Sequence, residues 1–418
     1  MPHRLLLLAA TAGLLLAPSL LGQRVVVVDA NNGPGTNHTT LAAAFADLQA
    51  DDYVIVRAGN YAGAHVSTQH SFCLVGEGNP VVAATPGSYA TTVEIAMWGG
   101  SQQRVSIRGM TFLSQNTGQW ALGTITYWNH WPAPTVHLED CVVDSNSPLA
   151  DRVSLLATSV GLTAQRCDLG TTQVVDSIAT FVDCTITGDD LSSYQGATQR
   201  AQTAIDVLRS TVWFVDCTVS AGDSNLVYAE PAACIGSTDY SNSITSHVYV
   251  CGNSTLRADQ SPHPSWPAPY VFHNYAPWYP PGIVEYEGSV VMLPTPGQGI
   301  ASGGLNVVQR SIACAEGSPA PLGGSFTTTV HGDANEIAFA FASMSTQPVN
   351  ALGTPLLLDL ATAVPIGFAV TNGSGDAAFP VAINNVNTLR GLVVEATGGR
   401  LTSTGALELT NPVAGLVH

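Results

Sequence analysis

Short segments in which hydrophobic and polar residues alternate recur between residues 136 and 253, and each is centred on a cysteine. The segments are Val136–Asp144, Leu162–Leu169, Ala179–Gly188, Thr211–Ser220 and, more weakly, His247–Asn253. Alternation with a period of two residues is the pattern of a β-strand, and β-rich units repeated in this way are typical of a chain that winds and stacks on itself. The pattern therefore predicts a β-solenoid.

The segment before these repeats contains strand, helix and turn signals in succession. Val25–Asp29 has the composition of a strand, and Thr39 or Thr40 can cap a helix over residues 41–49, whose apolar spacing is helical. Tyr53–Arg57 is a second predicted strand. Helical content after this point is too low for βαβ units, so parallel strands must be closed into a solenoid.

The run from Val28-Asp29 through this helix to Val54-Ile-Val-Arg-Ala-Gly-Asn-Tyr61 resembles the start of secreted right-handed parallel β-helix proteins, the pectate-lyase-like superfamily. The resemblance extends over residues 24–260 at the level of pattern, and it implies that the helix caps the first coil. It informs about fold rather than activity, because this fold hosts lyases, hydrolases, epimerases, adhesins and inert proteins.

The spacing of the repeats is irregular. The cysteine intervals are 26, 17, 33 and 34 residues. Seventeen residues is short for a full coil, so Cys167 or Cys184 is expected on a different face, and the longer intervals require insertions such as residues 188–209. Residues 261–282 are rich in Pro and aromatic residues. Since Pro lacks the N–H that a ladder needs, this segment predicts a long ordered loop rather than a central strand.

From residue 325 onwards, short alternating segments separated by Gly and Asn turns predict a small antiparallel β-sandwich. The expected strands are Phe326–Val330, Glu336–Ala342, Pro355–Leu360, Gly367–Val370, Ala377–Val381, Gly391–Glu395 and Ala406–Leu409. The predicted organisation is a signal peptide over residues 1–22, a right-handed parallel β-helix over 23–315, a linker over 316–324 and a β-sandwich accessory domain over 325–418.

Composition narrows the class of partner. Charged residues are 10% of the 418 residues, against about 25% in an ordinary soluble domain. The 13 basic residues are all arginine, a usage that suggests a bacterial protein, and the net charge is -17. Such a surface repels nucleic acid and anionic lipid, which argues against both as partners. The oligomeric state is left open.

The N-terminus has the features of a secretory signal. A short basic region, Met1–Arg4, precedes the apolar stretch Leu5–Leu21, and small Gly22 offers a cleavage point. An N-terminal membrane anchor is the alternative. No long apolar run follows residue 22, so we expect a protein that is secreted to the cell surface, the medium or the periplasm, without membrane insertion after signal removal.

An even number of cysteines, eight, permits disulfides in an oxidising compartment. In stacked strands, however, neighbouring Cβ atoms point the same way, which disfavours a bridge. We therefore expect Cys141, Cys167, Cys184 and Cys217 to be buried thiols that fill one column of the core.

The residues directly before these cysteines suggest a charged column. With consecutive coils in register, Arg166 would lie between Asp140 and Asp183, and Asp216 would follow. One interpretation is a calcium or uronate site that uses Asp183 and Asp216. The alternative is a solvated row of turns with a modest ion pair. Calcium is the one cofactor that the sequence suggests.

Asp189, Asp190 and Arg200 are the candidate catalytic residues, in the 188–209 insertion. Paired carboxylates could act as general acid and base on a glycoside, or with the arginine in lyase chemistry. Asp189-Asp190 resembles the Asp-Asp pair of polygalacturonase-like hydrolases on this fold, although the Asn-x-Asp and Gly-His-Gly motifs of that family are absent. Adjacent Asp residues also occur in ordinary turns.

Two clusters of aromatic residues are the candidate substrate-binding groups. They are Trp120, Tyr127, Trp128, Trp131, Trp266, Tyr270, Tyr275 and Trp278. Such rings could stack on sugar rings, or they could pack the loops onto the solenoid. The first hypothesis is therefore a secreted protein that binds extracellular polysaccharide. A polysaccharide lyase or glycoside hydrolase and a non-catalytic surface structural protein are the alternatives.

Overall fold

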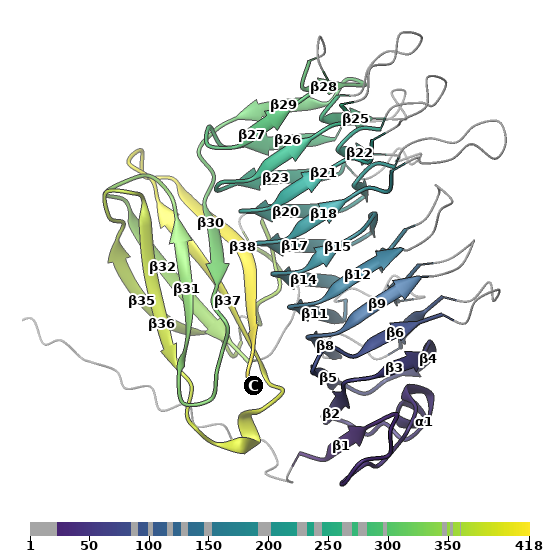
Figure 1. Ribbon diagram of the computed structural model, residues 1–418. Coiled ribbons are helices and arrows are strands. Elements are labelled where there is room, and N and C mark those ends of the chain that lie inside the picture. The colour runs from purple at the N-terminus through teal and green to yellow at the C-terminus, as the bar shows by residue number, and fades with distance from the viewer. Residues whose placement is uncertain are drawn as a thin grey trace, which may run out of the picture.

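Three long parallel β-sheets dominate the computed structural model, and successive turns of the chain are stacked along them (Figure 1). The sheets have 11, 9 and 9 strands, and we call them sheets A, B and C. The structure describes residues 23–84, 91–98, 103–114, 120–126, 133–145, 153–190, 202–223, 232–237, 245–260, 270–274, 282–295, 299–344, 349–351, 354–359 and 361–418. The predicted parallel β-helix is confirmed.

Each coil contributes one strand to each sheet. Sheet A contains β1 (Val25–Val28), β2 (Asp52–Arg57), β5 (Phe72–Glu77), β8 (Arg104–Arg108), β11 (Thr135–Glu139), β14 (Gly161–Gln165), β17 (Ile178–Val182), β20 (Thr211–Val215), β23 (His247–Cys251), β26 (Ile283–Tyr286) and β29 (Asn306–Gln309). Sheet B contains β3 (Asn60–Ala62), β6 (Val81–Ala83), β9 (Thr111–Ser114), β12 (Val142–Ser145), β15 (Asp168–Leu169), β18 (Thr185–Thr187), β21 (Thr218–Ser220), β24 (Thr255–Arg257) and β27 (Val291–Leu293). Sheet C contains β4 (Ala64–Thr68), β7 (Val93–Met97), β10 (Leu122–Ile125), β13 (Leu155–Thr158), β16 (Thr172–Val175), β19 (Ile205–Leu208), β22 (Ile235–Ser237), β25 (Phe272–Asn274) and β28 (Ala301–Ser302).

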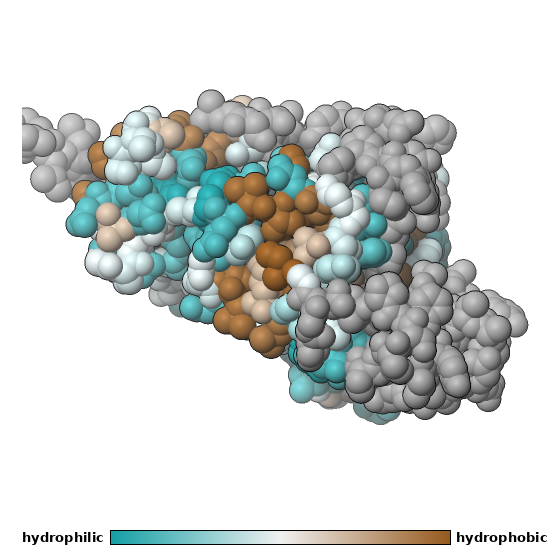
Figure 2. Space-filling view, turned by 90° about the horizontal axis from the view of Figure 1, so that it is seen from above, coloured by the Kyte–Doolittle hydropathy of each residue, from teal (hydrophilic) through white to brown (hydrophobic). Residues whose placement is uncertain are grey.

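The two ends of the β-helix are finished differently. At the first coil, helix α1 (Leu41–Ala46) buries Leu41 and Phe45, and its N-cap Thr40 accepts a hydrogen bond from the backbone of Ala43. The predicted capping helix is therefore present. The last coil carries no such cap among the described residues, and apolar side chains form a patch in the view from above (Figure 2). The strands of that coil include exposed Val291 and Val308.

A one-residue turn connects sheet A to sheet B in the central coils. Its residue has a positive φ in each coil, namely Asp140, Arg166, Asp183 and Asp216. The cysteine that follows points into the core, and the four cysteines Cys141, Cys167, Cys184 and Cys217 are buried and free. Each thiol donates to the carbonyl two residues before it. The predicted column of buried thiols is confirmed.

The next residue of this column is a serine. Thr218 pairs with Thr255, which aligns Cys217 with Ser254. Cys251 instead pairs with Val215 on the outer side of sheet A, because two residues rather than one form the turn in that coil. The assignment of His247–Asn253 to the cysteine repeat therefore holds for its strand but not for its cysteine.

Two sequence expectations are wrong. Residues 161–177 contain β14, β15 and β16, and Ile178 pairs with Gly161, so seventeen residues make a complete coil and Cys167 stacks beside Cys184. The corners of this coil are only two residues long, which explains its shortness. The Pro-rich segment 261–282 also contains a central strand, β25, because Phe272–Asn274 itself lacks proline.

The C-terminal residues form antiparallel sheets, as expected. The strands are β30 (Cys314–Gly317), β31 (Ser325–His331), β32 (Ile337–Ser343), β33 (Val349–Ala351), β34 (Thr354–Leu356), β35 (Val364–Val370), β36 (Asp376–Ala382), β37 (Val393–Leu401) and β38 (Leu407–Leu416), with a short 3-10 helix at Asn387–Leu389. Every predicted strand of this region overlaps an observed one. The antiparallel pairing begins already at Cys314, because β30 pairs with β31.

These antiparallel sheets cover the outer face of sheet A (Figure 1). Val182 and Val215, which point outwards from sheet A, share a hydrophobic cluster with Val394 and Val413. As a result, β11, β14 and β17 are buried on both faces. No helix among the described residues has the length and apolar character needed to cross a bilayer. Sheet C lies on the side of the β-helix that faces away from this contact (Figure 1).

Candidate functional site on the outer face of sheet C

One row of residues runs along the outer face of sheet C, with each residue directly paired to the next. The row is His65, Glu94, Gly123, Leu156, Gln173, Asp206, Gly236, His273 and Ser302. The residues on either side of it in each strand, such as Ile205 and Phe272, point into the core. Apart from Leu156, this row presents polar and small residues on a rigid scaffold, which makes it the candidate site. We call the set the sheet C row.

Asp206 is the most unusual member of the sheet C row. It interrupts the apolar strand Ile205–Leu208 and points outwards between Gln173 and Gly236. Its side chain is half-buried, and its Oδ1 is shielded from solvent and accepts no hydrogen bond from any described residue. Burial raises the pKa of Asp206 to about 6. A buried acceptor without a donor is costly, and such groups cluster where a ligand supplies the donor.

Trp120 lies against the same face. A Cβ atom built at Gly123 would be 2.1 Å from Nε1 of Trp120, so the indole occupies the space that a side chain at position 123 would need. The indole N–H is buried and has no partner among the described residues. Trp120 was predicted as a substrate-binding residue, and the structure places it on the sheet C row.

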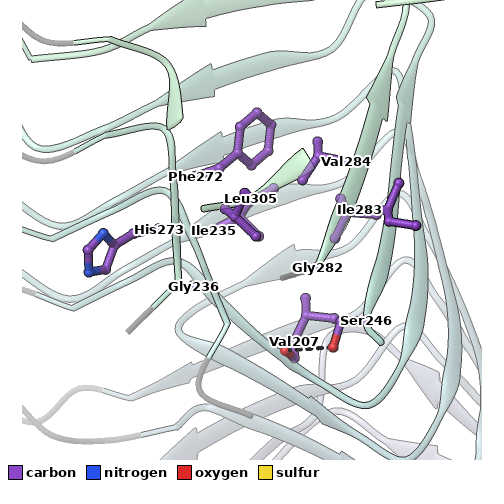
Figure 3. A pocket seen from close by; sticks show the side chains of 11 residues that line it. Val207, Ile235, Gly236, Ser246, Phe272, His273, Gly282, Ile283, Val284 and Leu305 are labelled. Atoms are coloured by element: carbon purple, nitrogen blue, oxygen red, sulfur yellow. Dashed lines mark hydrogen bonds between the residues drawn. The ribbon is translucent and has the colours of Figure 1, made fainter. Parts of the chain in front are cut away.

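Tyr270, a second predicted aromatic residue, lies at the other end of the row. Its ring stacks with that of His273, with the centroids 6.5 Å apart and the planes 10° from parallel. His273 points away from Phe272 and from the core (Figure 3), and its Nδ1 lies 2.5 Å from Oγ of Ser302. The two aromatic residues thus lie over the same row, at strands β10 and β25.

Further polar and aromatic groups lie at the N-terminal end of the row. His65 Nδ1 is 3.3 Å from Glu94 Oε1. Trp98, which follows β7, is 42% exposed, and its Nε1 donates to Ser67 Oγ at 2.6 Å. The row therefore has aromatic and imidazole rings near both ends and the carboxylate of Asp206 between them.

A small void inside the β-helix is not a binding site. It has a volume of about 20 Å³ and lies among Ile235, Phe272 and Val284, with Ser246 Oγ donating to the carbonyl of Val207 at its edge (Figure 3). This is close to the space that one water needs. It is a packing defect of the last coils, enclosed by apolar side chains.

A larger cleft of about 780 Å³ lies between the last coils and the antiparallel sheets. His331 lines it, with Nδ1 2.9 Å from Asp376 Oδ1 and Nε2 3.2 Å from Glu316 Oε1. Although burial disfavours the imidazolium, the two carboxylates raise the pKa of His331 to about 10. Burial and a hydrogen bond with Glu316 raise the pKa of Asp216 to about 6. Both ion pairs of His331 lie within the antiparallel sheets, and Asp216 of the β-helix lines the same cleft.

The residues of the predicted charged column, which include the candidate calcium ligands Asp183 and Asp216, lie in different environments. Arg166 donates to Asp140 Oδ1 at 2.9 Å, as the stacking of coils predicts. Asp183 is exposed at its turn, and Asp216 lies in the cleft, where its carboxylate accepts from the backbone of Asn253. No group of three His, Cys, Asp or Glu residues within the described part of the chain could hold a metal ion. A calcium site at Asp183 and Asp216 stays a prediction.

The predicted catalytic pair lies at the corner that follows β18. Asp190 Oδ1 accepts a hydrogen bond from the backbone of Asp223 at 2.7 Å, and the carbonyl of Asp189 accepts from Gln202. Arg200 lies outside the described residues. The hydrogen bond of Asp190 joins two successive coils, and the catalytic role of the three residues stays a prediction.

Most of the predicted aromatic residues fall outside the described part of the chain. These are Tyr127, Trp128, Trp131, Trp266, Tyr275 and Trp278. Sequence reasoning missed Asp206, although the signal was present, since a lone carboxylate in an otherwise apolar strand has to point outwards. It also missed that Gly123 makes room for Trp120, because that requires the position of the indole.

The chain is similar to several solved structures at low identity. A pectin methylesterase variant in complex with a hexasaccharide matches with a TM-score of 0.38 and 10% identity, over 68% of this chain and 92% of that one. An alginate lyase from Paenibacillus sp. str. FPU-7 matches with a TM-score of 0.27 and 8% identity, over 69% and 98%. A tailspike protein variant of E. coli bacteriophage HK620 in complex with a pentasaccharide matches with a TM-score of 0.20 and 11% identity, over 94% and 92%. No family model and no curated protein matches the chain.

Proposed function

We propose that this protein binds extracellular polysaccharide along the outer face of sheet C. The observation that carries the proposal is that Trp120 and Tyr270 lie over one row of residues, and that the polar members of this row include Gln173, Asp206 and His273. From Gly123 to His273 the row crosses five strand spacings. Since neighbouring strands are ~4.8 Å apart, this is about 24 Å, a length that suits a polymer segment rather than a single small molecule.

The residue types suit sugar recognition. The apolar faces of sugar rings pack on aromatic rings, and sugar hydroxyls exchange hydrogen bonds with carboxylate, amide and imidazole groups. Gln173, Asp206 and His273 supply these groups within the row. Oδ1 of Asp206 and the indole N–H of Trp120 are buried without a described partner, and a sugar hydroxyl that reaches either group would supply the missing hydrogen bond.

The proposal includes export of the protein, as the N-terminal sequence predicts. The buried thiols are compatible with an oxidising compartment, because burial raises the pKa of Cys141, Cys167 and Cys184 well above its usual range and keeps the reactive thiolate scarce. Cell fractionation of the native producer, with and without residues 1–22, tests export separately from binding.

Binding is tested with pull-down and calorimetry on a panel of neutral and acidic polysaccharides. Trp120→Ala and Tyr270→Ala are each expected to weaken the best ligand by roughly tenfold, since a stacking ring is lost. Phe368→Ala is the matched control, because Phe368 is 71% exposed on the antiparallel sheets, away from sheet C. Equal losses in all three variants, or no binding to any polymer, would refute the proposal.

Cleavage of the bound polymer is the second candidate function, and Asp206 is the observation that favours it. A carboxyl group with a pKa near 6 can donate a proton to a leaving oxygen near neutral pH. Release of new reducing ends or unsaturated uronates, measured for the unchanged protein and for Asp206→Asn, Asp189→Asn and Asp190→Asn, tests this function and distinguishes the two predicted positions. Loss of product in only one class of variant identifies the acid.

A further inference from the structure

The described charges on the outer face of sheet C are unbalanced towards the negative. The sheet C row contains two carboxylates, Glu94 and Asp206, and no lysine or arginine. Its two imidazoles are engaged locally, since His65 contacts Glu94 and His273 contacts Ser302. The whole chain carries 30 acidic against 13 basic residues.

The arginine nearest to Asp206 in the sequence, Arg209, already has a carboxylate partner. Arg209 directly follows β19, and its Nε and Nη2 donate to the two carboxylate oxygens of Asp176 at 2.6 and 2.7 Å. A bidentate pair of this kind satisfies the guanidinium fork, which otherwise would be the natural group to hold a sugar carboxylate. Using Arg209 for a ligand would leave Asp176 without its partner.

We infer that the site selects polysaccharides without carboxylate groups, with Asp206 accepting a hydrogen bond from a sugar hydroxyl at the centre of the row. This inference rests on the proposed function and names the substrate class of the same site. An ionised Asp206 is an acceptor only, so a hydroxyl satisfies it whereas a carboxylate repels it. Oδ1 of Asp206 has no donor among the described residues, so a hydroxyl that reaches this half-buried carboxylate displaces no protein contact.

Polymers that share a backbone but differ in charge give the sharpest test. The probes are hydroxyethylcellulose against carboxymethylcellulose, and the full methyl ester of polygalacturonate against polygalacturonate, with binding measured by affinity electrophoresis and calorimetry at pH 7.5. We expect the uncharged member of a pair to bind at least about tenfold more tightly, the factor expected for a charged hydrogen bond replaced by a repulsion. Each pair is measured with calcium and with chelator, so that a bridging ion is detected.

Asp206→Asn separates the role of the carboxylate from the role of the rings. The variant is expected to bind the uncharged probe roughly tenfold more weakly and to lose much of its discrimination against the charged one. Asp168→Asn is the matched control, because Asp168 is an exposed carboxylate on the outer face of sheet B and its loss changes net charge equally. Circular dichroism confirms that both variants fold.

The outcomes distinguish the inference from the function on which it rests. Equal or tighter binding of the carboxylated member overturns the inference while leaving polysaccharide binding in place. The same holds if Asp206→Asn behaves like Asp168→Asn. If no member of either pair binds and the wider panel yields only an acidic ligand, the inference is also wrong. Absence of binding to every polymer refutes the proposed function itself.

Discussion

The backbone N–H of Leu416 donates to Oε2 of Glu139 at 3.1 Å, which joins the last strand of the chain to the outer face of sheet A. Glu139 is fully buried, and it also contacts His137 Nε2 at 3.2 Å and Arg166 Nη2 at 2.7 Å. Glu139 is a residue of strand β11 in the β-helix, and its carboxylate accepts a hydrogen bond from strand β38 of the antiparallel sheets. It makes the docking of the antiparallel sheets specific as well as apolar.

Removal of this carboxylate should therefore weaken the contact strongly. Glu139→Ala leaves the buried N–H of Leu416 without its acceptor and removes one of the two carboxylates that pair with Arg166, and the expected loss is about 3 kcal/mol in the free energy of unfolding. Urea unfolding measures it. Asp140→Asn is the control at the next residue, because its carboxylate is exposed and asparagine tolerates the positive φ there; a loss of at most ~1 kcal/mol is expected. Similar losses in both variants would show that Glu139 has no special role.

The same residue predicts sensitivity to acid. Burial opposes the ionisation of Glu139, but the hydrogen bond and charge of His137 and the charge of Arg166 outweigh it and lower the pKa of Glu139 from 4.5 to about 2. A lowered folded-state pKa stabilises the fold above pH 4.5, and this contribution is lost as pH falls towards 2. Thermal melts between pH 6 and 2 should show a fall in this window that is smaller in Glu139→Gln. An unchanged pH dependence in the variant would contradict the assignment.

His331 predicts that the protein also loses stability at alkaline pH. Its pKa is raised to about 10, despite burial, by Glu316 and Asp376. A raised folded-state pKa stabilises the fold below pH 6.5, and the contribution is lost as pH rises towards 10. Melting temperatures measured from pH 6 to 10.5 should therefore fall, and His331→Gln should flatten the curve. The control is His65→Gln, since His65 lies on sheet C, far from this ion pair. If His65→Gln flattened the curve and His331→Gln did not, the interpretation would be rejected.

The architecture could be read from the sequence because it depends on local patterns. Alternation in each strand, the cysteine that follows a one-residue turn, and Thr40 before an apolar helix are all short-range signals, and each is present in the structure. The coil of residues 161–177 was misread because coil length depends on how short the corners can be, which no single repeat reveals.

The candidate site was only partly predictable for a physical reason. Asp206 and Gly123 come from strands that lie 83 residues apart in sequence, and only the stacking of coils brings them into one row. Asp189-Asp190 attracted attention as an adjacent pair, whereas the shielded carboxyl is a single residue. Aromatic composition singled out Trp120 and Tyr270, and the structure places both rings over the outer face of sheet C, while their contact with sugar stays a prediction.

The cysteine column predicts thiols that resist modification in the folded protein. All eight cysteines are buried and free. Labelling with a water-soluble disulfide reagent at pH 8 should therefore be slow for the native chain and should reach eight thiols once the chain is unfolded in denaturant without reductant. Fewer than eight thiols in the unfolded chain would reveal a disulfide. Cys184→Ser should cost little stability, because Ser254 already continues the same column and its hydroxyl donates to a backbone carbonyl.

Gly123→Ala should displace the indole ring of Trp120 from the sheet C row while the tryptophan itself is retained. The added methyl group would lie 2.1 Å from Nε1 and 2.5 Å from Cδ1 of the indole, far inside van der Waals contact, so the ring must leave the sheet C row. Polysaccharide affinity should fall about as much as in Trp120→Ala, roughly tenfold, while the strand pairing of β10 persists. The shift is visible as a change in tryptophan fluorescence, and binding is measured by affinity electrophoresis. Gly373→Ala is the matched control, since no atom lies within 4 Å of the added Cβ there. Retained affinity in Gly123→Ala, together with a shifted indole, would show that Trp120 packs the fold and does not contact the ligand.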